Sequence, residues 1–342
     1  MPGSVNFAGW TFTWSIPNNW GGGLVISKAN FNNTSVLYKA TQPFVLVPYH
    51  GNSPHFKDGL NNQGAPYTPV LPTSANAPVG LATPPAGNDN AWDPVTNPQG
   101  AVVLEQQPAT LLEPARVAVW CKLQCYNYQY IHRWEFRADG SIEASVGLGG
   151  RLWTTDPPIM GHIHNFYFRL DVDLASAGNN LVQEFSHAGN NPNQDGWQNI
   201  LTEGSRTAKL NQATKWRVVN KAAKPNGQMR SYELTPTSDM GPDGTYSSAD
   251  LWVLQYDANQ DGGAVGFTDQ VLGSSYLHGA NAPVDGRDVV VWYCMRHHHE
   301  PRQLGEETTV LPYEFLSFHM EPRDFLDATP KNLYATTPPS PI

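Results

Sequence analysis

Between residues 116 and 175 the sequence carries its clearest β-strand patterns. Apolar and polar side chains alternate with a period of two over 130–137, the residues 138–141 have the composition of a turn, and the alternation returns over 142–148. Because successive side chains of a strand point to opposite faces, this pattern predicts a β-hairpin. After a Pro-Pro break, another strand is predicted over 161–174.

The composition indicates the same fold class. Glycine (30) and proline (29) make 59 of the 342 residues, so turns are frequent. The aromatic-rich, weakly charged mixture excludes a coiled coil or helical bundle, and 40% apolar residues exclude disorder. We therefore expect an all-β chain folded as a large antiparallel β-sandwich. Further strands are predicted at 43–49, 214–220, 229–235, 250–256 and 288–296, and a long loop or pair of excursions at 61–100.

Charge and cysteine content limit the partners and the compartment. A net charge of -9 argues against a nucleic-acid partner, which requires a basic surface. No run approaches the roughly 18 apolar residues of a membrane span, and the first residues lack the pattern of a signal peptide. The 3 cysteines are too few for a disulfide framework. We expect no membrane association and a cytoplasmic location.

Two kinds of metal-binding side chain share the strand predicted at 161–174. His162 and His164 are two residues apart and point to one face, whereas Asp171 and Asp173 have the opposite parity. Imidazoles suit copper, zinc, iron or nickel, and carboxylates suit calcium, magnesium or manganese. The alternative is that the histidines pack in the core and the aspartates are solvated.

A third source of imidazole follows the apolar strand predicted at 288–296. The sequence continues as three consecutive histidines, of which His297 and His299 share one face of a strand. Parity therefore leaves both as candidates for a site with His162 and His164. A polar strand end is the alternative reading.

Three tyrosines, Tyr126, Tyr128 and Tyr130, share one strand face, which by itself is typical of half-buried packing. Together with the histidines, they are part of a wider pattern. The chain resembles, nearly end to end, the catalytic domain of copper-containing, topaquinone-dependent amine oxidases. The resemblance rests on Val47-Pro-Tyr49, Asn127-Tyr128-Gln129-Tyr130, Trp134-Glu-Phe136, Asp139-Gly-Ser-Ile-Glu143, His162-Ile-His164, Leu251-Trp-Val-Leu-Gln-Tyr256, His299-Glu-Pro-Arg302, Leu311-Pro-Tyr-Glu314 and Met320-Glu-Pro-Arg-Asp-Phe325.

The resemblance assigns roles to particular residues. Tyr128 matches the tyrosine that copper and dioxygen convert into topaquinone, and Tyr49 matches the tyrosine that hydrogen-bonds the quinone. Asn127 belongs to the catalytic motif, and Asp58 is the best candidate for the base that removes a substrate proton. The copper ligands implied are His162, His164 and His299. A second, structural cation such as calcium is implied at Asp171, Val172, Asp173, Asp288 and Val289.

The resemblance also implies an activity and an assembly. A primary amine is oxidised to an aldehyde, ammonia is released, and dioxygen is reduced to hydrogen peroxide. We expect a single catalytic domain over 1–342, without the α/β domains that usually precede it in the family. The family forms homodimers with arms that extend from the sandwich, and residues 236–250 match a shortened arm.

Several departures from the family pattern keep other functions open. Gln129 replaces an acidic residue, Gln124 replaces a threonine, and Asp58 lacks the Gly-Glu-Tyr that follows the family's base. His55 and Asp93 are weaker candidates for that base. The alternatives are a copper oxidase or oxygenase in which Tyr128 stays a tyrosine, a sugar-binding β-sandwich without catalysis, and a zinc hydrolase built on three histidines.

Overall fold

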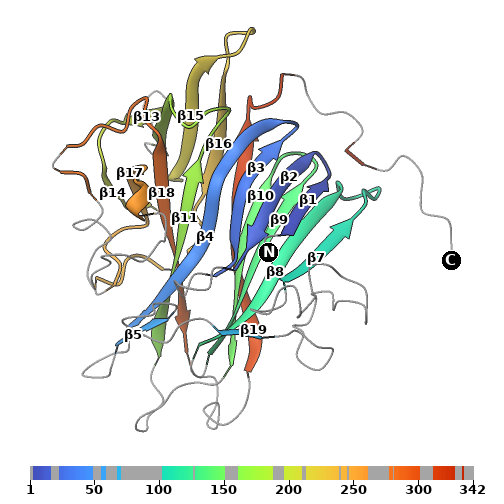
Figure 1. Cartoon of the computed structure of the whole chain (residues 1–342). Helices are drawn as coiled ribbons and strands as arrows, with labels where there is room; N and C mark the ends of the chain where they lie inside the picture. Colours follow the sequence, from blue (N-terminus) through green and yellow to red (C-terminus); the bar gives the residue numbers. More distant parts are fainter. Residues whose placement is uncertain are drawn as a thin grey trace, which may run out of the picture.

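Two antiparallel β-sheets face one another across a shared apolar core (Figure 1). The computed structural model describes residues 3–16, 23–48, 55–58, 68–70, 102–125, 128–150, 161–187, 196–209, 213–238, 240–244, 246–260, 277–279, 281–300, 311–327 and 333–334. Over these residues, helical structure is limited to the 3-10 turn η3 (Ala258–Gln260), and no helix is long and apolar enough to cross a membrane. The predicted all-β sandwich is confirmed.

The first sheet, sheet A, has β4, β11 and β18 at its centre. In spatial order its strands are β1 (Gly3–Phe7), β2 (Trp10–Ser15), β3 (Val25–Phe31), β4 (Thr34–Pro48), β11 (His162–Val172), β18 (Val289–His299), β17 (Leu251–Gln255) and β14 (Gly204–Arg206), with β5 (His55–Asp58) paired to β4.

The second sheet, sheet B, contains the hairpin predicted from the alternation. In spatial order its strands are β13 (Gly196–Ile200), β12 (Asn180–Ser186), β15 (Lys215–Ala223), β16 (Met229–Thr235), β19 (Leu311–Arg323), β10 (Ile142–Gly150), β9 (Tyr128–Arg137), β8 (Arg116–Cys125) and β6 (Thr68–Val70), with β7 (Val102–Gln107) paired to β8.

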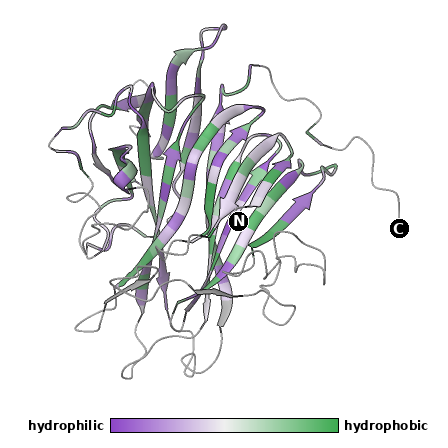
Figure 2. Ribbon diagram, in the orientation of Figure 1, coloured by the Kyte–Doolittle hydropathy of each residue, from purple (hydrophilic) through white to green (hydrophobic). Residues whose placement is uncertain are grey.

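Alternating side chains explain where the core lies. Along β9, Tyr130, Trp134 and Phe136 point inward. Tyr130 and Trp134 meet Phe166 and Phe168 of β11, and Phe136 meets Phe12 of β2. Figure 2 shows the corresponding alternation of hydrophobic and hydrophilic bands along the strands. Burial of these large side chains, at about 25 cal/mol per Å² of apolar surface, is the main force that holds the sheets together.

The centre of sheet A is also covered on its outer face. An apolar cluster there includes Tyr167, Trp252 and Trp292, and it packs under Tyr246 and Ala249 from the segment 236–250. This segment therefore lies against its own sheet, and the expectation that it forms an arm extending from the sandwich is wrong. The physical reason is its apolar and hydrogen-bonding side chains, which find partners on sheet A.

The strand predicted at 43–49 is part of the longer strand β4, which contains Pro43. Pro43 has no N–H for the ladder, and the register between β4 and β11 shifts between the pairs Tyr167–Phe44 and Arg169–Thr41. The resulting bulge accommodates Pro43, so the strand continues from Thr34 through it.

Candidate metal centre

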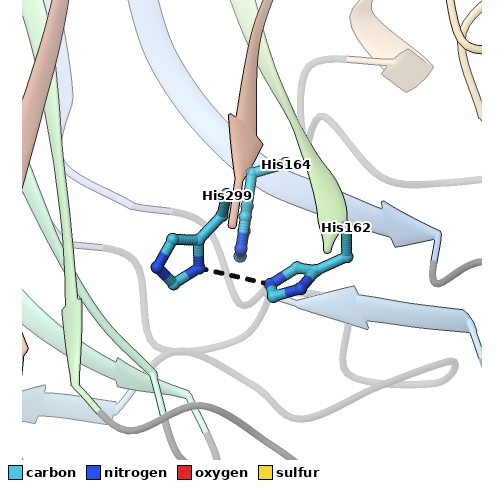
Figure 3. A group of neighbouring side chains, drawn as sticks. All are labelled: His162, His164 and His299. Atoms are coloured by element: carbon cyan, nitrogen blue, oxygen red, sulfur yellow. Dashed lines mark hydrogen bonds between the residues drawn. The ribbon is translucent and has the colours of Figure 1, made fainter. Parts of the chain in front are cut away.

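Three buried histidines converge at one end of the sandwich (Figure 3). His162 begins β11 and His299 ends β18, and the two are directly paired in the ladder. His164 lies two residues further along β11, on the same face as His162. All three point inward, since His162 and His164 share parity with the core residue Phe166. One ring nitrogen from each lies within 4.8 Å of the others.

The histidine cluster has the properties of a metal-binding site. The Nδ1 of His299 lies 3.4 Å from the Nε2 of His162, and the buried Nε2 of His164 has no hydrogen-bond partner among the described residues. Burial, reinforced by the neighbouring His162 and His299, holds the pKa of His164 well below its ordinary value. A neutral imidazole with an unused buried nitrogen is the form that binds a metal, and three imidazoles suit copper.

Tyr128 lies against this cluster from the opposite sheet. Its hydroxyl is 2.9 Å from the Nε2 of His162, and its ring centroid is 5.0 Å from that of His164. The side chain is 4% exposed, so the phenol is held in a largely water-free environment. Tyr130, next on the same face of β9, has its hydroxyl 3.4 Å from the Nδ1 of His164.

The structure distinguishes the two histidines that strand parity could not separate. His299 joins the cluster, whereas His297 places its Nε2 2.7 Å from the Oε2 of Glu314 on β19 of the opposite sheet. The His297 and His299 rings stack with centroids 6.3 Å apart. The His297–Glu314 pair was not anticipated, although the parity of Glu314 with the core residue Phe318 indicates that it points inward.

Gln129 and Gln124, two departures from the family pattern, are cross-strand partners. They are paired in the β8–β9 ladder, and the Gln129 amide donates to the Oε1 of Gln124 at 2.9 Å. The Tyr313 hydroxyl donates to the Oε1 of Gln129 at 2.7 Å. Tyr313 can approach because Gly149 has no side chain, since a Cβ there would lie 2.8 Å from the Tyr313 ring. The two substitutions therefore form one hydrogen-bonded unit on the outer face of sheet B, on the side of β9 opposite to the Tyr128 side chain.

A carboxylate cluster occupies the other face of β11. Asp171, Asp173 and Asp288 place one oxygen each within 4.8 Å of one another. Within the described residues, the buried Oδ1 atoms of Asp173 and Asp288 have no hydrogen-bond partner, and the Arg169 guanidinium lies 3.6 Å from Asp171. Burial, and secondarily Asp288, raises the pKa of Asp173 to about 6. Buried carboxylate oxygens without partners suit a hard cation such as calcium.

The remaining residues expected at these sites are described less completely. Val172 and Val289 are buried in β11 and β18, and the Val172 carbonyl accepts a hydrogen bond from Asn180 at 3.3 Å. Asp58 ends β5, where its backbone pairs with Val45, and its side chain lies outside the described residues. Tyr49, Asn127 and the weaker base candidate Asp93 also lie outside them, as does the side chain of His55.

Comparison with known proteins relates this arrangement to one family. The family model described as "Copper amine oxidase, enzyme domain" matches residues 106–339. A copper-containing amine oxidase, gamma 1, from Arabidopsis thaliana is 22% identical, over 95% of this chain and 56% of its own length. The primary amine oxidase of Arthrobacter sp. (strain P1) is 26% identical, over 60% of this chain and 37% of its own length. The chain thus spans about half the length of such relatives, or less.

Solved structures show the same fold. A copper-containing benzylamine oxidase from Hansenula polymorpha aligns with a TM-score of 0.70 and 18% identity, over 95% of this chain and 60% of that one. A lysyl oxidase from Pichia pastoris aligns with a TM-score of 0.68 and 15% identity, over 95% of this chain and 52% of that one. At these identities the likeness concerns the fold alone.

Proposed function

Since the chain belongs to the copper amine oxidase family, we propose that it is a copper-dependent oxidase of primary amines in which Tyr128 is the precursor of topaquinone. The observation that carries this proposal is the position of the Tyr128 hydroxyl, 2.9 Å from one of three clustered imidazoles. A phenol so close to a metal-binding set is placed to be oxidised by a bound metal and dioxygen.

His162, His164 and His299 hold copper in this proposal, and their burial keeps water from the ring of Tyr128. Copper and the quinone together supply the oxidation of the amine to an aldehyde, with release of ammonia and reduction of dioxygen to hydrogen peroxide. Asp58 is proposed as the base that accepts the substrate proton, with Tyr49 and Asn127 orienting the modified Tyr128.

The carboxylate cluster is proposed to bind a structural cation, with calcium the best match to oxygen ligands. The unpartnered oxygens of Asp173 and Asp288 support this role, and the carbonyls of Val172 and Val289 complete the set. The cation would lie on the outer face of β11 while copper lies on the inner face, so the two sites are separate. A homodimer is proposed as the working assembly.

Aerobic loading of the metal-free protein with copper tests the activity. Hydrogen peroxide release is followed with methylamine and benzylamine, the amines in the names of two relatives. We expect copper-dependent turnover of at least one primary amine, loss of turnover in Tyr128→Phe, and retained turnover in Tyr130→Phe. Full activity in Tyr128→Phe would contradict the proposed role of Tyr128.

A second function is favoured by the Gln124–Gln129 pair. These amides replace a threonine and an acidic residue of the family pattern, and Gln129 follows Tyr128 in β9 with its side chain on the opposite face of the strand. A copper oxidase in which Tyr128 remains unmodified would show copper-dependent oxygen uptake, with the ordinary mass of the peptide that contains Tyr128. Added oxygen atoms on that peptide exclude this second function.

A further inference from the structure

Cys125 lies directly opposite Tyr128 in the β8–β9 ladder. Only two residues separate them along the chain, and they are the last pair of the ladder. Directly opposed residues of an antiparallel pair project to the same face, with Cβ atoms about 4.5–5.5 Å apart. The thiol of Cys125 is therefore a neighbour of the Tyr128 ring.

Both side chains point into the sandwich. The inward face of β8 continues from Cys125 through Leu123 and Cys121, and all three belong to the central core cluster together with Tyr128. Cys125 is 1% exposed and Tyr128 4% exposed. A buried thiol beside a buried phenol is shielded from other reactants, so its chemistry is decided by its immediate neighbours.

The histidine cluster is one of those neighbours. The Tyr128 hydroxyl faces His162, and the unpartnered Nε2 of His164 belongs to the imidazole ring nearest to the Tyr128 ring. Cys125, the Tyr128 ring and the imidazole nitrogens of the histidine cluster therefore lie in this order across the interior. An oxidising metal bound to the histidines would act on the phenol whose residue is paired with Cys125 in the ladder.

We propose that Cys125 and Tyr128 become joined by a thioether bond when copper occupies the histidine cluster in air. The new bond links the Cys125 Sγ to a ring carbon of Tyr128. One hydrogen leaves the thiol and one leaves the ring, and dioxygen accepts both with their electrons and becomes hydrogen peroxide. This inference rests on the proposed copper site but does not require the quinone.

The fold supplies an internal comparison. Cys294 is directly opposite Tyr167 in the β11–β18 ladder, and both are buried. This second pair lies on the outer face of sheet A, where the Tyr167 hydroxyl donates to the Tyr246 carbonyl oxygen at 2.5 Å. Because the histidine cluster is on the inner face, the same pair of side chains should remain unlinked there.

Trypsin separates the relevant residues cleanly. Cleavage after Lys122 and Arg133 releases residues 123–133, which contain both Cys125 and Tyr128, whereas Cys121 and Cys294 fall in other peptides. The full-length protein is loaded with copper in air, denatured, reduced, alkylated with iodoacetamide and digested. We expect Cys125 to escape alkylation, its peptide to lack two hydrogens, and Cys121 and Cys294 to be alkylated in full.

Variants and the metal-free protein complete the test. Cys125 should become alkylatable without copper and in Tyr128→Phe, while Cys125→Val should still bind copper. Alkylation of Cys125 to the same extent as Cys294 in the copper-loaded, aerated protein overturns the thioether.

The same peptide mass distinguishes this inference from the quinone proposal. Added oxygen on Tyr128 with a free Cys125 contradicts the thioether and supports the quinone. A blocked Cys125 with no added oxygen on Tyr128 supports the thioether and contradicts the quinone. A protein that binds no copper and keeps Cys125 free contradicts both.

Discussion

At the scale of single residues, His299 and His297 differ in what their ring nitrogens face. His299 faces the other two imidazoles, and His297 faces a carboxylate of the opposite sheet. Removing a ligand costs more metal affinity than removing a residue that only supports the ligands, for which about 10- to 100-fold is typical. We expect His299→Ala to lower copper affinity by more than this range and His297→Ala to stay within it.

Isothermal titration of each variant with copper(II) measures this difference. His319→Ala is the control, because His319 lies on β19 with a half-exposed side chain near Glu143. Equal losses in His297→Ala and His299→Ala would show that the two histidines were assigned incorrectly.

The carboxylate cluster makes a separate prediction about stability. A ligand at 100 times its dissociation constant stabilises a protein by about 2.7 kcal/mol if it binds only the folded state. Calcium should therefore raise the thermal midpoint of the wild-type chain, and Asp173→Asn and Asp288→Asn should lose that response. Asp285→Asn, which alters an exposed ion pair, should keep it. A thermal midpoint that changes neither with calcium nor with a chelator would contradict the cation site.

Single residues also show how far the sequence can be interpreted. Strand parity correctly placed His162 and His164 on one face and Asp171 on the other, because side-chain direction follows from the backbone alone. It could not choose between His297 and His299, since their difference depends on Glu314, which comes from another strand of the opposite sheet. The Gln124–Gln129 contact likewise depends on the register between β8 and β9.

At the level of elements, a buried arginine contributes to the attachment of the segment 236–250 to sheet A. Arg296 of β18 donates to Ser247 at 2.7 Å, and it also contacts Asp250 and the Ala249 carbonyl. Removing one partner of a buried ion pair costs about 3–5 kcal/mol, because the other charge stays buried without compensation. We expect Asp250→Ala to lower the free energy of unfolding by this amount.

Chemical denaturation with urea measures the effect of Asp250→Ala. The matched control is Asp285→Ala, whose carboxylate pairs with Lys221 at 2.7 Å while both side chains remain exposed. An exposed pair of this kind contributes about 0–1 kcal/mol. If the two variants lose equal stability, the segment is not anchored through Arg296.

A second element, the segment 277–279, is tied to the edge of sheet A by a histidine. The His278 Nδ1 lies 2.7 Å from the Oε1 of Glu203, and its Nε2 lies 3.4 Å from Asp257. The hydrogen bond with Glu203 raises the pKa of His278 above its ordinary value of 6.5. A raised pKa means that the stabilisation is fully present below pH 6.5 and is lost as the pH rises through the folded-state pKa.

Comparison with His278→Gln isolates this contribution. The difference in free energy of unfolding between wild type and variant should be largest in mildly acidic buffer and should shrink as the pH rises. Asp257 does not obscure it, because its own pKa is lowered from 3.8 and titrates in a more acidic range. A difference that is constant across this pH range would refute the charged pair.

The strands differ in how well they can be predicted from the sequence. The hairpin of β9 and β10 and the strand β16 follow their alternating patterns closely. The strands β1, β2, β3 and β12 are not among those predicted. In β3 and β12 polar and small residues interrupt the alternation, whereas β2 alternates strictly and could have been identified by its pattern. The strand β6 lies within the stretch expected to be a loop, and its pairing with β8 is a tertiary effect.

At the scale of the whole molecule, the metal-binding nitrogens and Tyr128 come from different sheets. β11 and β18 of sheet A supply the histidines, and β9 of sheet B supplies the tyrosine. The site therefore forms only when the two sheets pack, and core burial that stabilises the sandwich also sets the distance from Tyr128 to the histidine cluster. The chemistry is consequently a property of the complete sandwich.

In the function we propose, copper bound by these histidines turns Tyr128 into a carbonyl-containing cofactor. Phenylhydrazine, a reagent for such carbonyls, tests it directly on the copper-loaded, aerated protein. We expect a coloured adduct carried by Tyr128 in the peptide 123–133, absent without copper and absent in His299→Ala. A fully copper-loaded, aerated protein whose Tyr128 stays unlabelled would contradict it.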